Sequence, residues 1–247
     1  MKISTPTQLR EYYQQTEIAE EYIAKRFSEP LNIVEHQRQV KLINKIIAER
    51  GIKNILEFAP GPARLTIDLE ATDGTSIDFS EKMISIAKQR MGVVGKKWNF
   101  IKGDILTIKL KEKYDLLFCI RFILHFQQEE REIIYQQARS ALCKGGYLVF
   151  EALNKKKVER IRNILGRKNY HIYDKLYTRQ ELEKEVERNG FKVLQTYPIL
   201  NNFWCQAILS RPCKMLGMKS ASVKIINLLE KIPSSQPYEW IVLCQKK

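Results

Sequence analysis

The 247-residue chain lacks any apolar run near the roughly 20 residues that a membrane-spanning helix needs, and no secretory apolar stretch opens it. Its five cysteines form no Cys-x-x-Cys pair, and its three histidines form no His-x-x-x-His pair. No Gly-Lys-Ser/Thr sequence of a P-loop is present. These absences argue against a zinc site or other metal centre and against a triphosphate cradle. They predict reduced thiols in a cytoplasmic protein.

Acidic residues are scarce in two parts of a chain whose net charge is +14. Between Glu187 and Glu230 there is no Asp or Glu, while lysines and arginines recur. The segment 155–168 contains seven Lys and Arg residues and a single acid, Glu159. This basicity suits an anionic substrate, an anionic membrane surface or nucleic acid, and it also suits a solvated surface that only aids solubility.

The stretch 54–70, NILEFAPGPARLTIDLE, predicts a buried strand, a tight turn at 59–62 and a helix whose apolar residues face a sheet. An acid, Asp78, follows at the end of the next apolar run. Strand, glycine-containing turn and helix open a nucleotide-binding α/β fold, in which an acid at this distance binds ribose hydroxyls.

The turn itself narrows the choice of nucleotide. A pyrophosphate requires backbone N–H donors, but Pro60 and Pro62 have none to give, and Gly61 is the only glycine of the turn. A dinucleotide, and with it an NAD-linked oxidoreductase, is therefore disfavoured. A nucleoside without phosphates, held by its ribose, base and charged tail, fits better, and S-adenosylmethionine is such a molecule.

The same segment resembles motif I of the class I S-adenosylmethionine-dependent methyltransferases, an acid followed by three alternating small residues. In this chain the four positions are Glu57, Ala59, Gly61 and Ala63. Two of the three usual glycines are thus alanine, which permits close helix packing but tolerates positive φ less well than glycine.

Later motifs extend the resemblance. Asp78, Phe79, Ser80 and Met83 match the pattern D-x-S-x-x-M, which assigns the Asp78 carboxylate to both ribose hydroxyls, although Asp78 could instead only cap the next helix. Asp104 ends a predicted strand at 99–104, and the resemblance assigns it to the adenine amino group, the alternative being a turn aspartate. The predicted cofactor contacts are Tyr22, Arg26, Glu57, Ala59, Pro60, Gly61, Asp78, Phe79, Met83, Asp104, Ile105 and Ile120.

The segment after the predicted strand at 114–120 lines the methyl-transfer site in this family. By its position, His125 is the candidate general base, because imidazole can take a proton from a hydroxyl near neutral pH. The alternative is a histidine that only braces the loop. Arg121 is predicted to hold a substrate or cofactor carboxylate, or else to pair with an internal acid, and Glu151 is a further candidate substrate contact.

Residues 1–51 have helical periodicity and resemble the cap helices that many small-molecule methyltransferases place before their core. In the resemblance, Tyr22 and Arg26 close over the methionine end of the cofactor. The alternative is that Tyr22 belongs to the core and Arg26 is a surface charge.

The expected fold class is α/β, a Rossmann-like seven-stranded sheet in the order 3-2-1-4-5-7-6 with the last strand antiparallel, helices on both faces and an N-terminal helical cap. We expect a single domain, 1–247, comprising the cap at 1–51, a cofactor-binding core at 52–153 and a substrate-side half at 154–247. The amphipathic stretch 203–231 is predicted to be a lid over the substrate pocket, or else an element lying on a membrane surface.

The predicted function is methyl transfer from S-adenosylmethionine to an oxygen or nitrogen of a small molecule with an anionic, aromatic or lipidic part. A nucleic-acid methyltransferase is one alternative, but the segment CIRF lacks the Asn/Asp-Pro-Pro-aromatic motif, and no aromatic residues interleave with the basic segment 155–168. A non-catalytic cofactor-binding protein is the other, which the presence of Glu57, Asp78 and Asp104 opposes.

Overall fold

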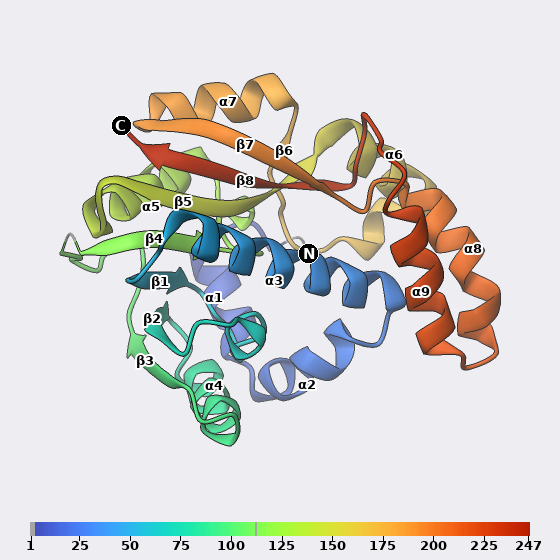
Figure 1. Cartoon of the computed structure of the whole chain (residues 1–247), viewed down its shortest axis with the longest axis horizontal. Helices are drawn as coiled ribbons and strands as arrows, with labels where there is room; N and C mark the ends of the chain where they lie inside the picture. Colours follow the sequence, from blue (N-terminus) through green and yellow to red (C-terminus); the bar gives the residue numbers. More distant parts are fainter. Residues whose placement is uncertain (1–2, 112) are drawn as a thin grey trace.

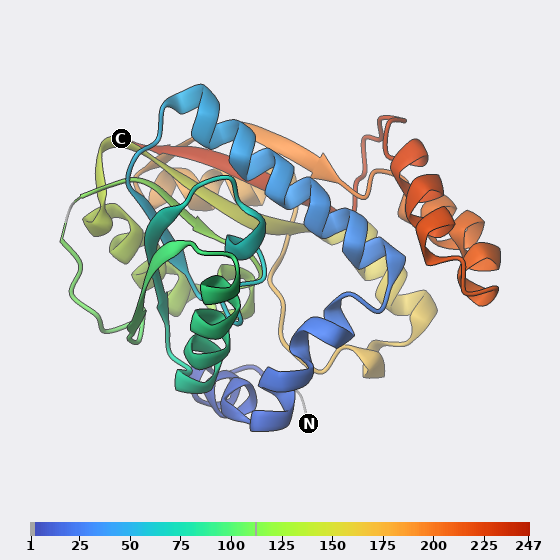
Figure 2. The ribbon, with the colours of Figure 1, turned by 60° about the horizontal axis from the view of Figure 1, so that its bottom comes forward.

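The computed structural model describes residues 3–111 and 113–247, which form a mixed sheet with helices on both faces (Figures 1 and 2). The strands are β1 (Ile55–Phe58), β2 (Asp73–Asp78), β3 (Lys97–Lys102), β4 (Tyr114–Cys119), β5 (Leu142–Asn154), β6 (Leu176–Tyr177), β7 (Phe191–Ile199) and β8 (Glu239–Lys246). The α-helices are α1 (Pro6–Gln14), α2 (Thr16–Arg26), α3 (Pro30–Arg50), α4 (Glu81–Val93), α5 (Gln128–Ala141), α6 (Lys155–Leu165), α7 (Arg179–Arg188), α8 (Phe203–Met215) and α9 (Lys219–Leu229). Three short 3₁₀ helices are η1 (Thr66–Asp68), η2 (Ile123–His125) and η3 (Arg167–Asn169).

The strand order is β3-β2-β1-β4-β5-β8-β7, with β8 antiparallel to both of its neighbours. Since β7 and β8 are the sixth and seventh of the long strands, the predicted order 3-2-1-4-5-7-6 with an antiparallel last strand is confirmed. The structure adds β6, which pairs with the end of β5. Two residues are too few to show a strand periodicity, so sequence patterns cannot reveal β6.

Side chains from the sheet alternate between two apolar layers. On β4, Leu117 contributes to the layer shared with α5 and α7, while Leu116 and Phe118 contribute to the layer shared with α3. The predicted N-terminal helical region is confirmed as α1, α2 and α3, and α3 ends at Gly51, whose φ of 60° is the left-handed conformation of a helix C-terminus. The division into 1–51, 52–153 and 154–247 stays a prediction.

The prediction of an α-helix directly after the turn at 59–62 is wrong. In its place the chain forms irregular turns and the three-residue η1. Ala63 has a φ of 56°, which an α-helix does not accommodate. The Lys96 ammonium donates to the carbonyl oxygens of Thr66 and Ile67, at 3.3 and 2.9 Å, so a distant side chain satisfies carbonyls that a helix would have bonded internally.

The parallel strands β1, β2, β3 and β4 all end at one edge of the sheet. The segments that follow them, which contain Ala59, Phe79, Asp104 and Arg121, therefore meet in space. In an open α/β sheet this edge, where the order reverses between β1 and β4, is where ligands bind. Among the described residues, no helix has the length and apolarity that crossing a membrane would require.

Candidate active site

The turn after β1 alternates between ordinary and left-handed backbone. Ala59, Gly61 and Ala63 have φ values of 52°, 56° and 56°. A Cβ built on Gly61 meets nothing within 4 Å, so glycine is needed there for conformation and not for space. The two alanines thus adopt the left-handed conformation that glycine adopts at lower cost.

Asp78, at the end of β2, holds this turn in place. Its Oδ2 accepts the Gly61 N–H at 3.0 Å, and its Oδ1 accepts the Ser80 N–H at 2.8 Å. Burial raises the pKa of Asp78 to about 6, although the backbone N–H donors oppose the shift. The cap of α4 is Ser80, which accepts the Met83 N–H at 3.3 Å, so Asp78 is left to position the turn and to face the cleft.

Glu57, the acid of the motif, is buried behind the turn. Its Oε2 accepts the hydroxyls of Thr66 and Ser76, the latter at 3.0 Å. Burial raises the pKa of Glu57 to about 7, with the two hydroxyls acting in the opposite direction. This carboxyl group is therefore close to half-protonated at neutral pH.

A cleft opens at this edge of the sheet, and it brings together nearly all of the predicted site. Its lining includes Tyr22, Glu57, Ala59, Pro60, Gly61, Asp78, Phe79, Met83, Asp104, Ile105, Ile120, Arg121 and His125. Of the predicted cofactor contacts, only Arg26 is outside the lining, and both predicted catalytic residues are inside it. No described residue of 203–231 lines the cleft, so the stretch predicted as a lid does not cover the cleft in this structure.

Two lining residues of α1 had no signal in the sequence. Arg10 forms an ion pair of 2.6 Å with the Oδ2 of Asp104, and its guanidinium lies 5.1 Å from the centre of the Phe79 ring. Tyr13 lines the cleft beside them. Because Arg10 and Asp104 are far apart in the chain, only the packing of α1 over the strand ends could reveal this pair. It closes the end of the cleft that the resemblance assigns to adenine.

His125 in η2 has one ring nitrogen engaged and one without a partner. Its Nδ1 lies 2.9 Å from the Oδ1 of Asp174 and 3.1 Å from the carbonyl oxygen of Tyr173. Both neighbours are acceptors, so Nδ1 carries the proton of the neutral ring and Nε2 has a free lone pair. Nε2 is buried and has no hydrogen-bond partner among the described residues.

Asp174 is a functional candidate that the sequence did not reveal, since it lies in an irregular segment before β6. Burial alone would raise its pKa, but the hydrogen bond to His125 and the charges of Arg121 and Arg162 outweigh burial and hold the pKa at about 2. Asp174 also forms an ion pair with Arg162 of α6, which belongs to the basic segment 155–168.

Arg121 lies between the cleft and a buried carboxylate. Its backbone φ is 60°, and its Nη1 is 3.6 Å from the Oε1 of Glu151. The side chain of Arg121 is 29% exposed, whereas that of Glu151 is fully buried. The predicted substrate contact by Glu151 is therefore indirect at most in this structure, and it is Arg121 that faces the cleft.

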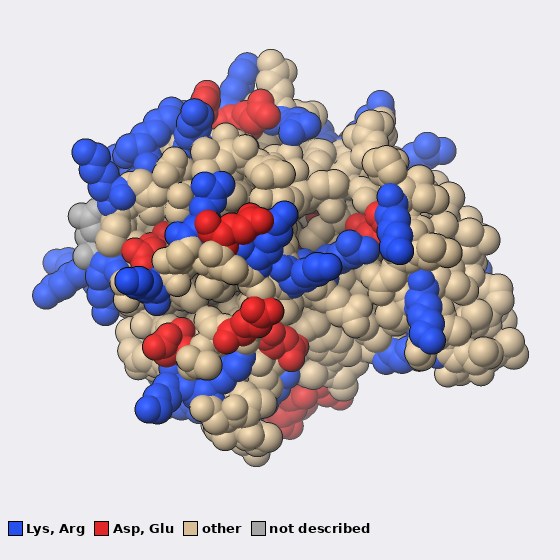
Figure 3. All heavy atoms as spheres, viewed as in Figure 1, with Lys and Arg blue, Asp and Glu red and all other residues tan. Residues whose placement is uncertain are grey.

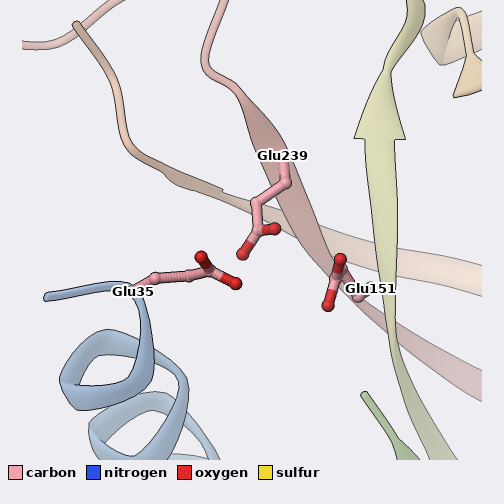
Figure 4. A group of neighbouring side chains, drawn as sticks. All are labelled: Glu35, Glu151 and Glu239. Atoms are coloured by element: carbon pink, nitrogen blue, oxygen red, sulfur yellow. The ribbon is translucent and has the colours of Figure 1, made fainter. Parts of the chain in front are cut away.

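Behind Arg121, the carboxyl groups of Glu35, Glu151 and Glu239 lie within 4.8 Å of one another, from α3, β5 and β8 (Figure 4). Arg26 pairs with Glu35, and the Gln39 amide donates to Glu35 and Glu239 at 3.3 and 3.1 Å. Arg26 is thus neither a surface charge nor a residue of the cleft lining.

This acidic cluster does not fit a metal ion. Burial raises the pKa of Glu151, and burial together with Glu151 and Glu35 raises that of Glu239. The charges of Arg26, Arg121 and Arg64 outweigh the effect of burial on Glu35 and lower its pKa. Three carboxyl groups beside the three guanidinium groups of Arg26, Arg64 and Arg121 form a set without the excess negative charge that a divalent cation needs.

Comparison with known proteins agrees with this geometry. Residues 55–146 match a family model described as a methyltransferase domain. No curated protein matches the chain. Among solved structures, the chain is similar to magnesium protoporphyrin IX methyltransferase from Synechocystis PCC 6803 with bound SAH, at 16% identity over 98% of this chain and 99% of that chain, with a TM-score of 0.69.

Two further structures share the fold. A S-adenosylmethionine-dependent methyltransferase from Clostridium acetobutylicum ATCC 824 is 13% identical over 95% of this chain and 98% of that chain, with a TM-score of 0.63. An N-methyltransferase from Bradyrhizobium japonicum WM9 in complex with S-adenosyl-L-homocysteine is 14% identical over 86% and 87%, with a TM-score of 0.57. At these identities the likeness establishes the fold.

The donor set of the cleft also suits the cofactor. The carboxyl groups of Asp78 and Asp104 are acceptors for ribose hydroxyls and an adenine amino group, and Met83 and Ile105 supply apolar surface for a base. Together with the methyltransferase domain matched over residues 55–146 and the shared fold, this indicates an S-adenosylmethionine-dependent methyltransferase.

Proposed function

We propose that this enzyme methylates an oxygen of a small molecule that carries an anionic group, with His125 as the general base. The observation that carries the proposal is the His125 ring, which belongs to the cleft lining. Its Nδ1 faces Asp174, and its Nε2 is buried without a hydrogen-bond partner among the described residues. A neutral imidazole held in this tautomer is prepared to accept a proton from a hydroxyl group.

The cofactor would be held by residues of the first half of the chain. Asp78 would accept the ribose hydroxyls, Asp104 the adenine amino group, and Tyr22 would lie over the methionine end. When bound, S-adenosylmethionine supplies an electrophilic methyl group on a cationic sulfur, which is already a good leaving group. The protein is therefore required mainly to align the acceptor, exclude water and remove one proton.

His125 would take the proton of the acceptor hydroxyl at Nε2. The ring then becomes a cation, and the carboxylate of Asp174, whose pKa is held at about 2, remains charged to stabilise it. The same pair fixes the ring orientation through Nδ1. An acceptor that is already ionised, such as a carboxylate, would not need this step.

Arg121 would bind the anionic part of the acceptor. It lines the same cleft as His125, and a guanidinium offers a planar set of N–H donors that matches a carboxylate. Glu151, behind it, limits the positions that the guanidinium can adopt. The small-molecule class is supported by the fold neighbours, whose names include a porphyrin methyltransferase and an N-methyltransferase.

A nucleic-acid substrate has less support. Figure 3 shows lysine and arginine side chains spread over one face of the molecule, with acidic side chains among them and no continuous basic track. Binding to a phosphate backbone depends on a row of basic contacts. On this face, the basic side chains therefore form local basic surfaces and not a nucleic-acid groove.

The test combines calorimetric titration of S-adenosylmethionine with methyl-transfer assays on hydroxylated aromatic acids and their uncharged analogues. His125→Asn should bind the cofactor like the wild type but reduce kcat by roughly 10²- to 10⁴-fold on hydroxyl acceptors. His171→Asn is the matched control, because His171 is an exposed histidine outside the cleft. Arg121→Gln should raise KM for anionic acceptors and leave it unchanged for the uncharged ones.

Wild-type kcat in His125→Asn would overturn the general-base assignment. An equal loss of activity toward charged and uncharged acceptors in Arg121→Gln would overturn the anionic specificity.

A further inference from the structure

Between β7 and β8 the chain forms a two-helix hairpin, α8 and α9, which we call the apolar hairpin (residues 203–232). It protrudes at one end of the molecule, beyond the sheet, in both ribbon views (Figures 1 and 2). Its neighbour in the body of the protein is α3. The cofactor cleft does not use it, and the methyl-transfer mechanism gives it no role.

The inside of the apolar hairpin holds several polar residues beside the buried Ile226 of α9. Gln206, Ser210 and Ser222 are buried between the two helices. The Ser222 hydroxyl donates to the carbonyl oxygen of Ser210 at 3.0 Å, and the Gln206 amide donates to the buried Glu230 carboxylate at 2.6 Å.

The outside of the apolar hairpin is apolar. Seven large hydrophobic side chains on it are between 53% and 77% exposed, namely Ile208, Leu209, Met215, Leu216, Met218, Leu228 and Ile232. Only two other large hydrophobic residues in the described chain, Val93 and Ile164, are this exposed. A helix on the surface of a water-soluble protein has the opposite pattern, with its apolar side turned to the core. Such a concentration of exposed apolar groups marks an interaction surface.

The exposed charged side chains of the apolar hairpin are all basic. Its exposed charged residues are Arg211, Lys214, Lys219, Lys224 and Lys231, and its only acid, Glu230, is buried and accepts the backbone N–H groups of Leu200 and Asn201 at 2.9 Å. Lys214 also pairs with Glu29 at 2.6 Å, and Lys219 donates to the Phe27 carbonyl, so the end of the hairpin is fastened to the segment after α2.

We infer that the apolar hairpin docks this enzyme on the surface of an anionic lipid bilayer. Exposed Leu, Ile and Met would enter the boundary between headgroups and acyl chains, and the basic side chains around them would meet anionic headgroups. A helix needs about 20 residues to span a bilayer, and α8 and α9 have 13 and 11 residues, so the hairpin would lie in the interface between headgroups and acyl chains.

A second copy of this chain suits the surface less well. In a symmetric dimer the same surface meets itself, so the basic side chains of both copies would approach one another without an exposed acid of the hairpin to oppose them. An anionic bilayer supplies the missing negative charge. The inference is independent of the identity of the methyl acceptor.

The test is flotation of the purified full-length protein with vesicles of phosphatidylcholine alone and of phosphatidylcholine mixed with phosphatidylserine. We expect binding to the mixed vesicles that weakens with added salt, and little binding to phosphatidylcholine. Met215→Glu with Leu216→Glu, and separately Arg211→Glu with Lys224→Glu, should each lower the partition coefficient roughly tenfold or more. Val93→Glu with Val94→Glu is the matched control, because these exposed apolar residues lie at the end of α4.

Circular dichroism and S-adenosylmethionine binding, unchanged in all three variants, would show that the fold is retained. Light scattering reports the oligomeric state of each. Equal binding of wild type and hairpin variants to the mixed vesicles, or no binding of the wild type, would overturn the inference. A wild-type dimer that the hairpin substitutions convert to monomers would assign the surface to a second copy instead.

Discussion

The Nδ1 atom of His125 lies 2.9 Å from the Oδ1 of Asp174, although the two residues come from different parts of the chain. The contact forms because the segment before β6 passes over η2, where the Lys175 N–H also donates to the Leu124 carbonyl oxygen at 2.7 Å. This backbone bond places Asp174 beside the ring. The pair therefore depends on the pairing of β6 with β5.

Asp174→Asn should lower kcat on hydroxyl acceptors on the order of 10²-fold without changing S-adenosylmethionine affinity. The amide cannot stabilise the His125 cation as a carboxylate does. Steady-state kinetics beside calorimetry would measure both quantities. The control is Arg162→Gln, which removes the other ion-pair partner of Asp174 and leaves its carboxylate in place. If both variants lost activity equally, Asp174 would be a structural residue only.

Ala59→Gly and Ala63→Gly should each stabilise the protein by about 1 kcal/mol, because both alanines have positive φ. The reverse change, Gly61→Ala, should destabilise it by a similar amount, on the order of 1 kcal/mol, since a Cβ there meets no neighbour and only the backbone conformation resists. Urea denaturation of the three variants measures these differences. Destabilisation by both alanine-to-glycine changes would show that the left-handed turn is not strained.

The buried carboxyl group of Glu57 should make stability fall as the pH rises. Its pKa is about 7 in the folded protein and near 4.5 in the unfolded chain. The folded state therefore binds the proton more tightly, and this contribution is complete below about pH 4.5 and lost as the pH passes 7. It amounts to roughly 3 kcal/mol.

Glu57→Gln removes that titration while keeping an acceptor for Thr66 and Ser76. The free energies of unfolding of wild type and variant should be measured between pH 4 and 8. We expect the variant to be the more stable protein at pH 8 relative to wild type, and this difference to shrink toward pH 4. Parallel pH profiles for the two proteins would contradict the assignment.

S-adenosylmethionine affinity should weaken as the pH falls through 6. Burial raises the pKa of Asp78 to about 6, and the protonated acid loses acceptor capacity for the ribose hydroxyls. Asp78→Asn should bind the cofactor about 10- to 100-fold more weakly at pH 8, the loss expected for hydrogen bonds to a charged group. The pH dependence near 6 should disappear in this variant, which calorimetry at several pH values would show.

Much of this architecture could be predicted from local sequence patterns. The apolar run at 114–120 and the alternation of strands and helices fix a sheet, and the acids at Glu57, Asp78 and Asp104 fall at strand ends, where parallel strands must bring them together. Short-range periodicity and position along a strand suffice for such features. The capping box of Thr178 and Glu181 at the start of α7 is of the same kind.

Tertiary contacts decided the rest. Lys96 bonds the carbonyls that would have made a helix after the turn, Arg10 reaches Asp104 across the packed α1, and Arg26 turns to the buried Glu35. In the apolar hairpin, Gln206, Ser210 and Ser222 are buried while large apolar side chains are exposed, which periodicity alone cannot reveal. In these cases the partner belongs to a different element of the fold, so packing and desolvation, and not local propensity, determine which neighbour each side chain meets.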